Sequence, residues 1–170
     1  MRSLPVALIL ISLAVILQSS VIVFLPNVFG GHPRPDIVFL LVLAWALHAP
    51  DFDSYAWAMI GGIWVDAFSI MPLGSTSLAY LVVIILIQWV KASLQESTII
   101  LPLVGCLLGT PVLLGILWLF STRSGWNWSL NDLFFQILPF TLVIHLLAIF
   151  PLSWGMGRLV RSLYPAAIKS

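Results

Sequence analysis

Two short stretches of the chain place charged side chains beside long apolar runs. The first is Arg34-Pro35-Asp36, and the second is Gly62-Ile63-Trp64-Val65-Asp66, with Pro72 and Gly74 following within eight positions. A carboxylate surrounded by apolar sequence is costly in lipid, so it normally faces protein or trapped water. These residues could therefore make a specific polar contact within a membrane or at its edge.

The composition excludes a soluble globular domain. Of 170 residues, 61% are hydrophobic and only 8% are charged, whereas soluble domains are about 25% charged. The net charge of +1, with few and scattered basic residues, gives no indication of nucleic-acid binding. The single Cys106 cannot form an internal disulfide. We expect one membrane domain covering residues 1–170.

The apolar segments predict an all-α integral membrane protein, a bundle of about six transmembrane helices. We read the first segment as a retained helix rather than a cleaved secretory signal, because no small-x-small site follows it. The second and fourth segments are short for spanning helices, so four spans with re-entrant pieces remain an alternative. A polar turn, Pro50-Asp51-Phe52-Asp53, separates the second segment from the third. The predicted helices cover residues 4–25, 36–49, 54–70, 77–90, 98–120 and 132–152.

The distribution of basic residues predicts the orientation. With six spans, the termini and the second and fourth loops share one side of the membrane. Basic residues are retained in the cytoplasm, so the richer side predicts that both termini are cytoplasmic. That side holds Arg2, Lys91, Arg158, Arg161 and Lys169, and the opposite side holds Arg34 and Arg123.

Ala58, Gly62 and Asp66 recur every four residues and therefore share one face of the third predicted helix. Small residues let another backbone approach closely, and the carboxylate would meet whatever approaches. Arg34 is the nearest plausible counter-charge for Asp66. Three roles stay open for this face: locking the second and third helices together, contacting a partner protein, or forming a small-ligand or ion site.

Asp36 stands at the start of a predicted helix, where a carboxylate can cap free backbone N–H groups. Pro35 before it fixes the entry of the chain. Pro72 and Gly74 predict a tight turn after the third helix, because proline presets φ and glycine relieves strain. We expect these roles to be structural.

Gly105 and Gly109 form a GxxxG pattern, which favours close helix packing. We favour packing inside the chain over dimerisation. His145 lies within the sixth segment, where a hydrogen bond to a neighbouring helix is a simpler role than chemistry. No metal-ligand spacing, nucleophile–base pair or phosphate loop occurs in the sequence, so we expect no cofactor, no metal and no enzymatic activity.

The spacing of Arg34-Pro35-Asp36, Gly62-x-x-x-Asp66 and Gly74 resembles that of the MreD family of rod shape-determining proteins. The motif region covers about residues 34–79, and the remaining helices match in hydropathy and order. The chain departs from many relatives in having Ala58 where they have glycine. It also has acidic rather than basic residues in the second loop.

The resemblance implies a non-enzymatic multi-pass protein of the bacterial cytoplasmic membrane. Such a protein maintains rod shape as part of the machinery that elongates the peptidoglycan wall. It implies binding to MreC, through a membrane helix or adjoining outer segment. It also implies a complex with MreB, RodA and a penicillin-binding transpeptidase. The Ala58/Gly62/Asp66 face, or the groove beside it, would receive MreC.

The MreD family also resembles the S subunits of energy-coupling-factor transporters in fold. This likeness supplies an alternative function, a small-molecule-binding transport subunit. In that case the outer loops at residues 26–35 and 121–131 would close over a ligand near Asp66.

Overall fold

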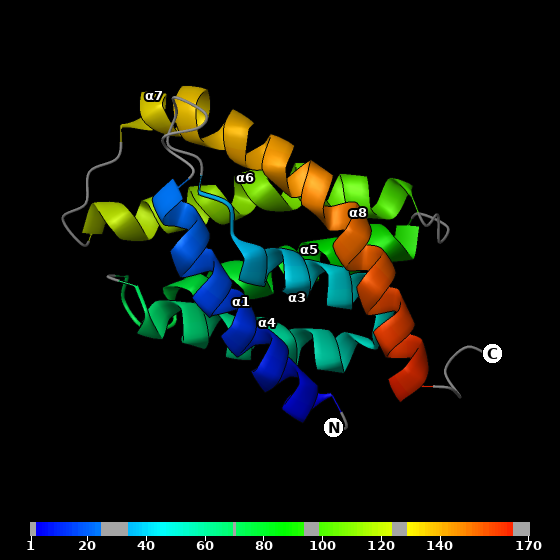
Figure 1. The fold of residues 1–170 in the computed structure, drawn as a ribbon. Helices are drawn as coiled ribbons and strands as arrows, with labels where there is room; N and C mark the ends of the chain where they lie inside the picture. The colour runs from blue at the N-terminus through cyan, green and yellow to red at the C-terminus, as the bar shows by residue number, and fades with distance from the viewer. Residues whose placement is uncertain (1–2, 25–33, 70, 94–98, 124–128, 165–170) are drawn as a thin grey trace.

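The structure is a computed structural model that describes residues 3–24, 34–69, 71–93, 99–123 and 129–164. All regular elements in these ranges are helical, and six of the helices are long (Figure 1). A short helix, α7, and a π-helical stretch, η1, lead directly into α8. The helices are α1 (Leu4–Phe24), α3 (Ile37–His48), α4 (Asp51–Ala67), α5 (Ser75–Ser93), α6 (Ile100–Arg123), α7 (Leu130–Asp132), η1 (Leu133–Ile137) and α8 (Leu138–Leu163).

The prediction of an all-helical chain with six long helices is confirmed. Most predicted helix ends lie within three residues of the observed ones, and two differences matter for the fold. The expected polar turn at residues 50–53 is the beginning of α4, with Pro50 as its N-cap residue. Proline fits there because the first N–H groups of a helix have no intrahelical partner, and Asp51 and Asp53 favour the helix dipole. The sixth helix was expected to end near residue 152, yet α8 continues through Pro151 to Leu163.

The C-terminal part of α8 is helical because it packs against the bundle. Met156, Gly157 and Val160 are buried on one face, while Trp154 and Arg158 lie on the other. Apolar residues at this spacing form the stripe of an amphipathic helix. Packing of this stripe offsets the hydrogen bond that Pro151 cannot donate.

Helix α3 forms the centre of the bundle. Every residue from Val38 to Leu47 is buried, and α3 contacts α1, α4, α5, α6 and α8. A helix that is apolar on all sides is stable only when other elements surround it. At 12 residues it measures about 18 Å, which is shorter than the hydrocarbon core of about 30 Å.

The two ends of α3 define two ends of the bundle. At the Asp36 end, Gln18 of α1 and Tyr80 of α5 reach the first residues of α3. At the His48 end, Lys91 donates to the carbonyl of Ala46 at 3.4 Å, and Ser153 of α8 contacts His48. The beginning of α1 and the end of α8 lie on the side of the bundle where α3 ends (Figure 1).

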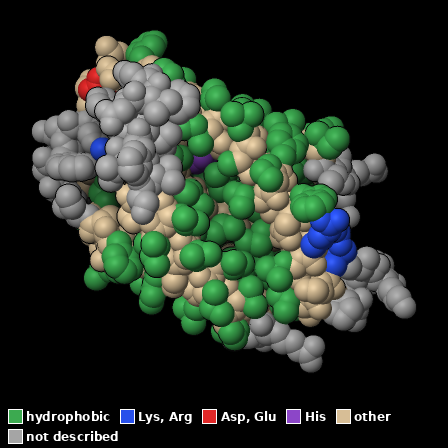
Figure 2. All heavy atoms as spheres, viewed as in Figure 1, with side chains coloured by type: hydrophobic (Ala, Val, Ile, Leu, Met, Phe, Trp, Pro, Cys, Tyr) green, Lys and Arg blue, Asp and Glu red, His purple; other side chains and the backbone are tan. Residues whose placement is uncertain are grey.

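Three helical stretches are long and apolar enough to cross a membrane: Ser75–Ser93, Ile100–Thr122 and Leu130–Leu163. Figure 2 shows hydrophobic side chains over most of the visible face and a group of Lys and Arg side chains at the right-hand end, over the C-terminal part of α8. Exposed large apolar side chains on a soluble domain would be costly. The chain is therefore a membrane-embedded protein.

Candidate functional site

The Asp36 carboxylate lies at the centre of a buried polar cluster that joins five helices. Its Oδ1 accepts a hydrogen bond from the backbone N–H of Phe39 at 2.9 Å, which makes Asp36 the N-cap of α3. Its Oδ2 accepts a hydrogen bond from the hydroxyl of Tyr80 in α5 at 2.5 Å. The predicted capping role of Asp36 is confirmed. We call this group the Asp36 cluster; it comprises Gln18, Arg34, Asp36, Tyr80, Thr110, Thr141 and His145.

Gln18 of α1 completes the cap of α3. Its side-chain oxygen accepts hydrogen bonds from the backbone N–H groups of Ile37 at 2.9 Å and Val38 at 3.3 Å. The first N–H groups of a helix have no intrahelical acceptor, and burying them unpaired in apolar surroundings is costly. Gln18 and Asp36 together therefore allow α3 to begin inside the bundle rather than in water.

His145 of α8 is held in one tautomer by two neighbours. Its Nε2 accepts a hydrogen bond from the backbone N–H of Asp36 at 3.0 Å. The proton of the neutral ring must then reside on Nδ1, which donates to Thr110 Oγ1 at 2.9 Å. Both ring nitrogens form hydrogen bonds to other elements, which is the role expected for His145 from the sequence.

Arg34 and Pro35 fix the entry into α3. The backbone N–H of Arg34 donates to Thr141 Oγ1 of α8 at 3.0 Å, and Pro35 is buried. Burial lowers the pKa of the Arg34 guanidinium from its ordinary value. Arg34 thus ties the segment before α3 to α8.

Asp66 caps a different helix. Its carboxylate accepts hydrogen bonds from the backbone N–H groups of Gly74 at 2.7 Å and Thr76 at 3.1 Å, and from the hydroxyl of Ser75 at 3.3 Å. These groups form the beginning of α5, where the helix dipole also favours a negative charge. Asp66 is only 2% exposed. The expectation that it locks the second and third helices is corrected, because it joins α4 to α5, the fourth predicted segment. The hydrogen-bond partners of Asp66 therefore come from the beginning of α5 and not from the guanidinium of Arg34, the counter-charge expected from the sequence.

The Ala58/Gly62/Asp66 face is covered by α5 of the same chain. A Cβ atom at Gly62 would lie 2.2 Å from the Cα and 2.3 Å from the N of Ser77, and Ala58 is fully buried. Ser77 also donates its hydroxyl to the carbonyl of Met59 at 3.0 Å. The expectation that this face receives a helix of another protein is wrong for this fold, because α5 already occupies it.

The turn between α4 and α5 places the donors that Asp66 binds. Gly74 has φ of +94°, a conformation that glycine adopts without a steric penalty. The carbonyl of Pro72 accepts hydrogen bonds from the N–H of Ser75 at 3.1 Å and from its hydroxyl at 2.8 Å. Pro72 and Gly74 therefore have structural roles in this turn.

Gly105 and Gly109 of α6 face the interior of the bundle. A Cβ at Gly109 would lie 2.9 Å from Val83 Cγ1 and 3.0 Å from Phe39 Cζ, and one at Gly105 would lie 3.3 Å from Leu43 Cδ1. The GxxxG pattern thus packs α6 against α3 and α5 of the same chain.

Sequence reasoning missed several members of the Asp36 cluster. Tyr80, Thr110 and Thr141 lie in apolar runs and carry no motif of their own. One available signal was their polarity, because a hydroxyl in an apolar helix requires a hydrogen-bond partner. Among the residues that the structure describes, no group of three His, Cys, Asp or Glu side chains is arranged to hold a metal ion.

Comparisons with protein-family models, with curated proteins and with solved structures find no match for this chain.

Proposed function

We propose that the chain is a non-enzymatic scaffold of the bacterial cell-wall elongation machinery. It would act in the cytoplasmic membrane by binding MreC, within a complex that includes MreB, RodA and a penicillin-binding transpeptidase. The residue pattern that resembles the MreD family supplies this identification. One structural observation carries the scaffold role: the carboxylates of Asp36 and Asp66 are both used to cap helices within the chain.

Both carboxylates are hydrogen-bonded inside the bundle, so a partner protein would contact the outer side chains instead. In a membrane these are apolar, and helix association there depends on packing rather than on the hydrophobic effect. The scaffold would therefore recognise a partner helix by shape.

The outer face of α8 is the surface that we assign to the MreC helix. Large apolar side chains are exposed there at alternating spacings of three and four residues: Phe140, Val143, Leu147, Phe150 and Trp154. This is the spacing at which two helices interlock side chains. Three stretches are long and apolar enough to span a membrane, and the one that contains α8 is the least covered by the rest of the chain. In its most apolar window 28% of the residues are buried, against 44% for Ser75–Ser93 and for Ile100–Thr122.

The transport alternative places a ligand near Asp66, and the geometry gives that site no support. The Asp66 carboxylate faces the beginning of α5 and is bound by its donors. Most of the residues expected to close over the ligand, including Trp126 and Trp128, lie outside the described residues. We therefore take the scaffold as the proposed function.

Co-purification of MreC with variants of α8 tests this proposal. Val143→Trp and Leu147→Trp keep the surface apolar but change its shape, so we expect at least about a fivefold loss of bound MreC. Such a loss corresponds to about 1 kcal/mol. Ile9→Trp, on the exposed face of α1, is the matched control and should leave the yield unchanged. Equal yields from all three variants would remove α8 from the interface.

A further inference from the structure

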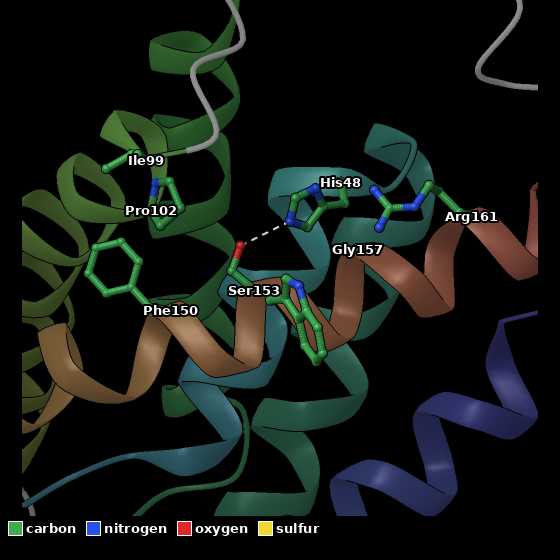
Figure 3. Close-up of a pocket in the computed structure, with 8 residues that line it drawn as sticks. His48, Ile99, Pro102, Phe150, Ser153, Gly157 and Arg161 are labelled. Carbon is green, nitrogen blue, oxygen red and sulfur yellow. Dashed lines mark hydrogen bonds between the residues drawn. The ribbon is translucent and has the colours of Figure 1, made fainter.

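A groove of about 320 Å³ lies at the His48 end of the bundle, between the beginning of α6 and the C-terminal half of α8 (Figure 3). It lies at the opposite end of α3 from the Asp36 cluster. It adjoins the outer face of α8 proposed for MreC and shares Phe150 and Trp154 with that face. The scaffold role does not use its polar side chains His48, Ser153 and Arg161. Its lining comprises His48, Ile99, Pro102, Phe150, Ser153, Trp154, Gly157 and Arg161.

The polar side chains gather on one side of the groove. Figure 3 shows His48 and Arg161 together there, with Ser153 beside them. His48 Nε2 lies 2.9 Å from Ser153 Oγ, so the imidazole and the hydroxyl hold each other in place. The ring rests on the backbone of Gly157, where a Cβ would lie 3.3 Å from two of its atoms. Glycine at this position therefore makes room for the imidazole.

The other side of the groove is apolar and is continuous with the exposed hydrophobic surface of the bundle. Ile99, Pro102 and Phe150 lie together, away from Arg161 (Figure 3). Ile99 and Phe150 are exposed on the outside of the bundle. The groove thus passes from a basic rim to a surface that faces hydrocarbon, which is the polarity of a single phospholipid.

We propose that the groove binds one anionic phospholipid, with its phosphate against Arg161, Ser153 and His48 and an acyl chain along Phe150 and Ile99. The Arg161 guanidinium supplies several donors for phosphate oxygens, and basic pockets between membrane helices are suited to such head groups. Arg161 has no hydrogen-bond or ion-pair partner among the described residues.

The charge of the lining selects an anionic lipid over a zwitterionic one. The residues that line the groove in the described chain include no aspartate or glutamate that would attract a choline or ammonium group. Arg158, one turn away on α8, stacks on Trp154 with its guanidinium carbon 3.5 Å from the ring centroid. Arg158 contributes to the general basic charge but does not line the groove, which makes it a control.

Native mass spectrometry of the purified full-length chain in detergent tests this proposal. The probes are phosphatidylglycerol, phosphatidylcholine with the same acyl chains, and inorganic phosphate. Arg161→Gln removes the proposed phosphate contact, and Arg158→Gln removes an equal charge from the same helix. Arg161 is exposed, so the variant should fold, and a thermal unfolding curve verifies this.

We expect one phosphatidylglycerol to remain bound in preference to phosphatidylcholine. Arg161→Gln should weaken this binding by more than about tenfold, as for loss of a hydrogen bond to a charged group. Arg158→Gln should weaken it by no more than about fivefold, as for one basic residue near a membrane surface. Equal losses from the two variants would show general attraction and overturn the site. Absence of a preference between the lipids, or displacement of phosphatidylglycerol by millimolar phosphate alone, would also overturn it.

Discussion

Ser77 of α5 packs directly on Gly62 of α4, so closely that a Cβ on Gly62 would lie 2.2 Å from the Cα of Ser77. The two helices approach at this point because neither a side chain nor a bound group separates them. Tyr80 lies three residues after Ser77, and Asp66 lies four residues after Gly62, so the contact lies within about one helical turn of a residue from each cap.

Gly62→Ala should destabilise the protein by at least about 2 kcal/mol, because the added methyl group must push two backbones apart. The measurement is thermal unfolding of the purified chain in detergent. Gly115→Ala is the matched control: it also lies within a long helix, but nothing lies within 4 Å of its added Cβ. We expect that control to leave stability unchanged or to raise it by up to about 1 kcal/mol.

Asp66→Leu should cost about 2–4 kcal/mol of stability, because the partly buried N–H of Gly74 and the buried N–H of Thr76 both lose their acceptor. Asp66→Asn retains one acceptor oxygen and should cost less. The exposed Asp51, in the first turn of α4, provides the control, and Asp51→Asn should change stability by less than about 0.5 kcal/mol. If Asp66→Leu unfolded at the wild-type temperature, the cap would have no energetic role.

Tyr80→Phe should cost about 1.5–3 kcal/mol, since it removes a buried donor to a carboxylate and leaves Asp36 with one fewer partner. Tyr55→Phe in α4 removes the same atom from a partly buried tyrosine with no hydrogen bond described for its hydroxyl. Chemical unfolding should therefore show a larger loss of stability for Tyr80→Phe than for Tyr55→Phe. Similar losses from both would mean that the hydroxyl acts through packing alone.

The proposed orientation predicts which engineered cysteines are reached from outside the cell. Leu73 is 76% exposed at the Asp36 end, whereas Ser162 is exposed on α8 at the His48 end. A membrane-impermeant maleimide should label Leu73→Cys in intact cells and Ser162→Cys only after permeabilisation. The native Cys106 is buried and provides an unlabelled background. The reverse pattern would place the basic end outside and contradict the proposed topology.

Hydropathy was sufficient to predict six helices because each apolar run must be helical to satisfy its own backbone in lipid. It did not predict the end of α8, where Arg158 and Arg161 lower the hydropathy although Met156 and Val160 still pack on the bundle. The beginning of α4 was missed for a related reason, since Asp51 and Asp53 are typical of a loop as well as of the first turn of a helix.

The candidate site was predictable only where its geometry is local. Asp36 caps the N–H of Phe39, three residues away, and the spacing alone indicates that role. The bonds from Tyr80 and His145 join residues 44 and 109 positions apart, and only the fold brings them together. The donors to Asp66 lie eight to ten residues later in the chain, and Gly74 among them belongs to the motif that contains Asp66. Their role depends on the close contact between α4 and α5, whereas the spacing of small residues had been interpreted as a contact between the second and third predicted helices.

We propose that this chain binds its partner with an outer helix face while its charged residues hold the bundle together. A photo-crosslinking amino acid at Leu147, which is 72% exposed on α8, tests it most directly in cells that contain MreC. We expect a crosslink to MreC from position 147 and none from the comparably exposed Ile9 on α1. Crosslinks from Ile9 but not from Leu147, or from neither while MreC still co-purifies, would contradict the claim.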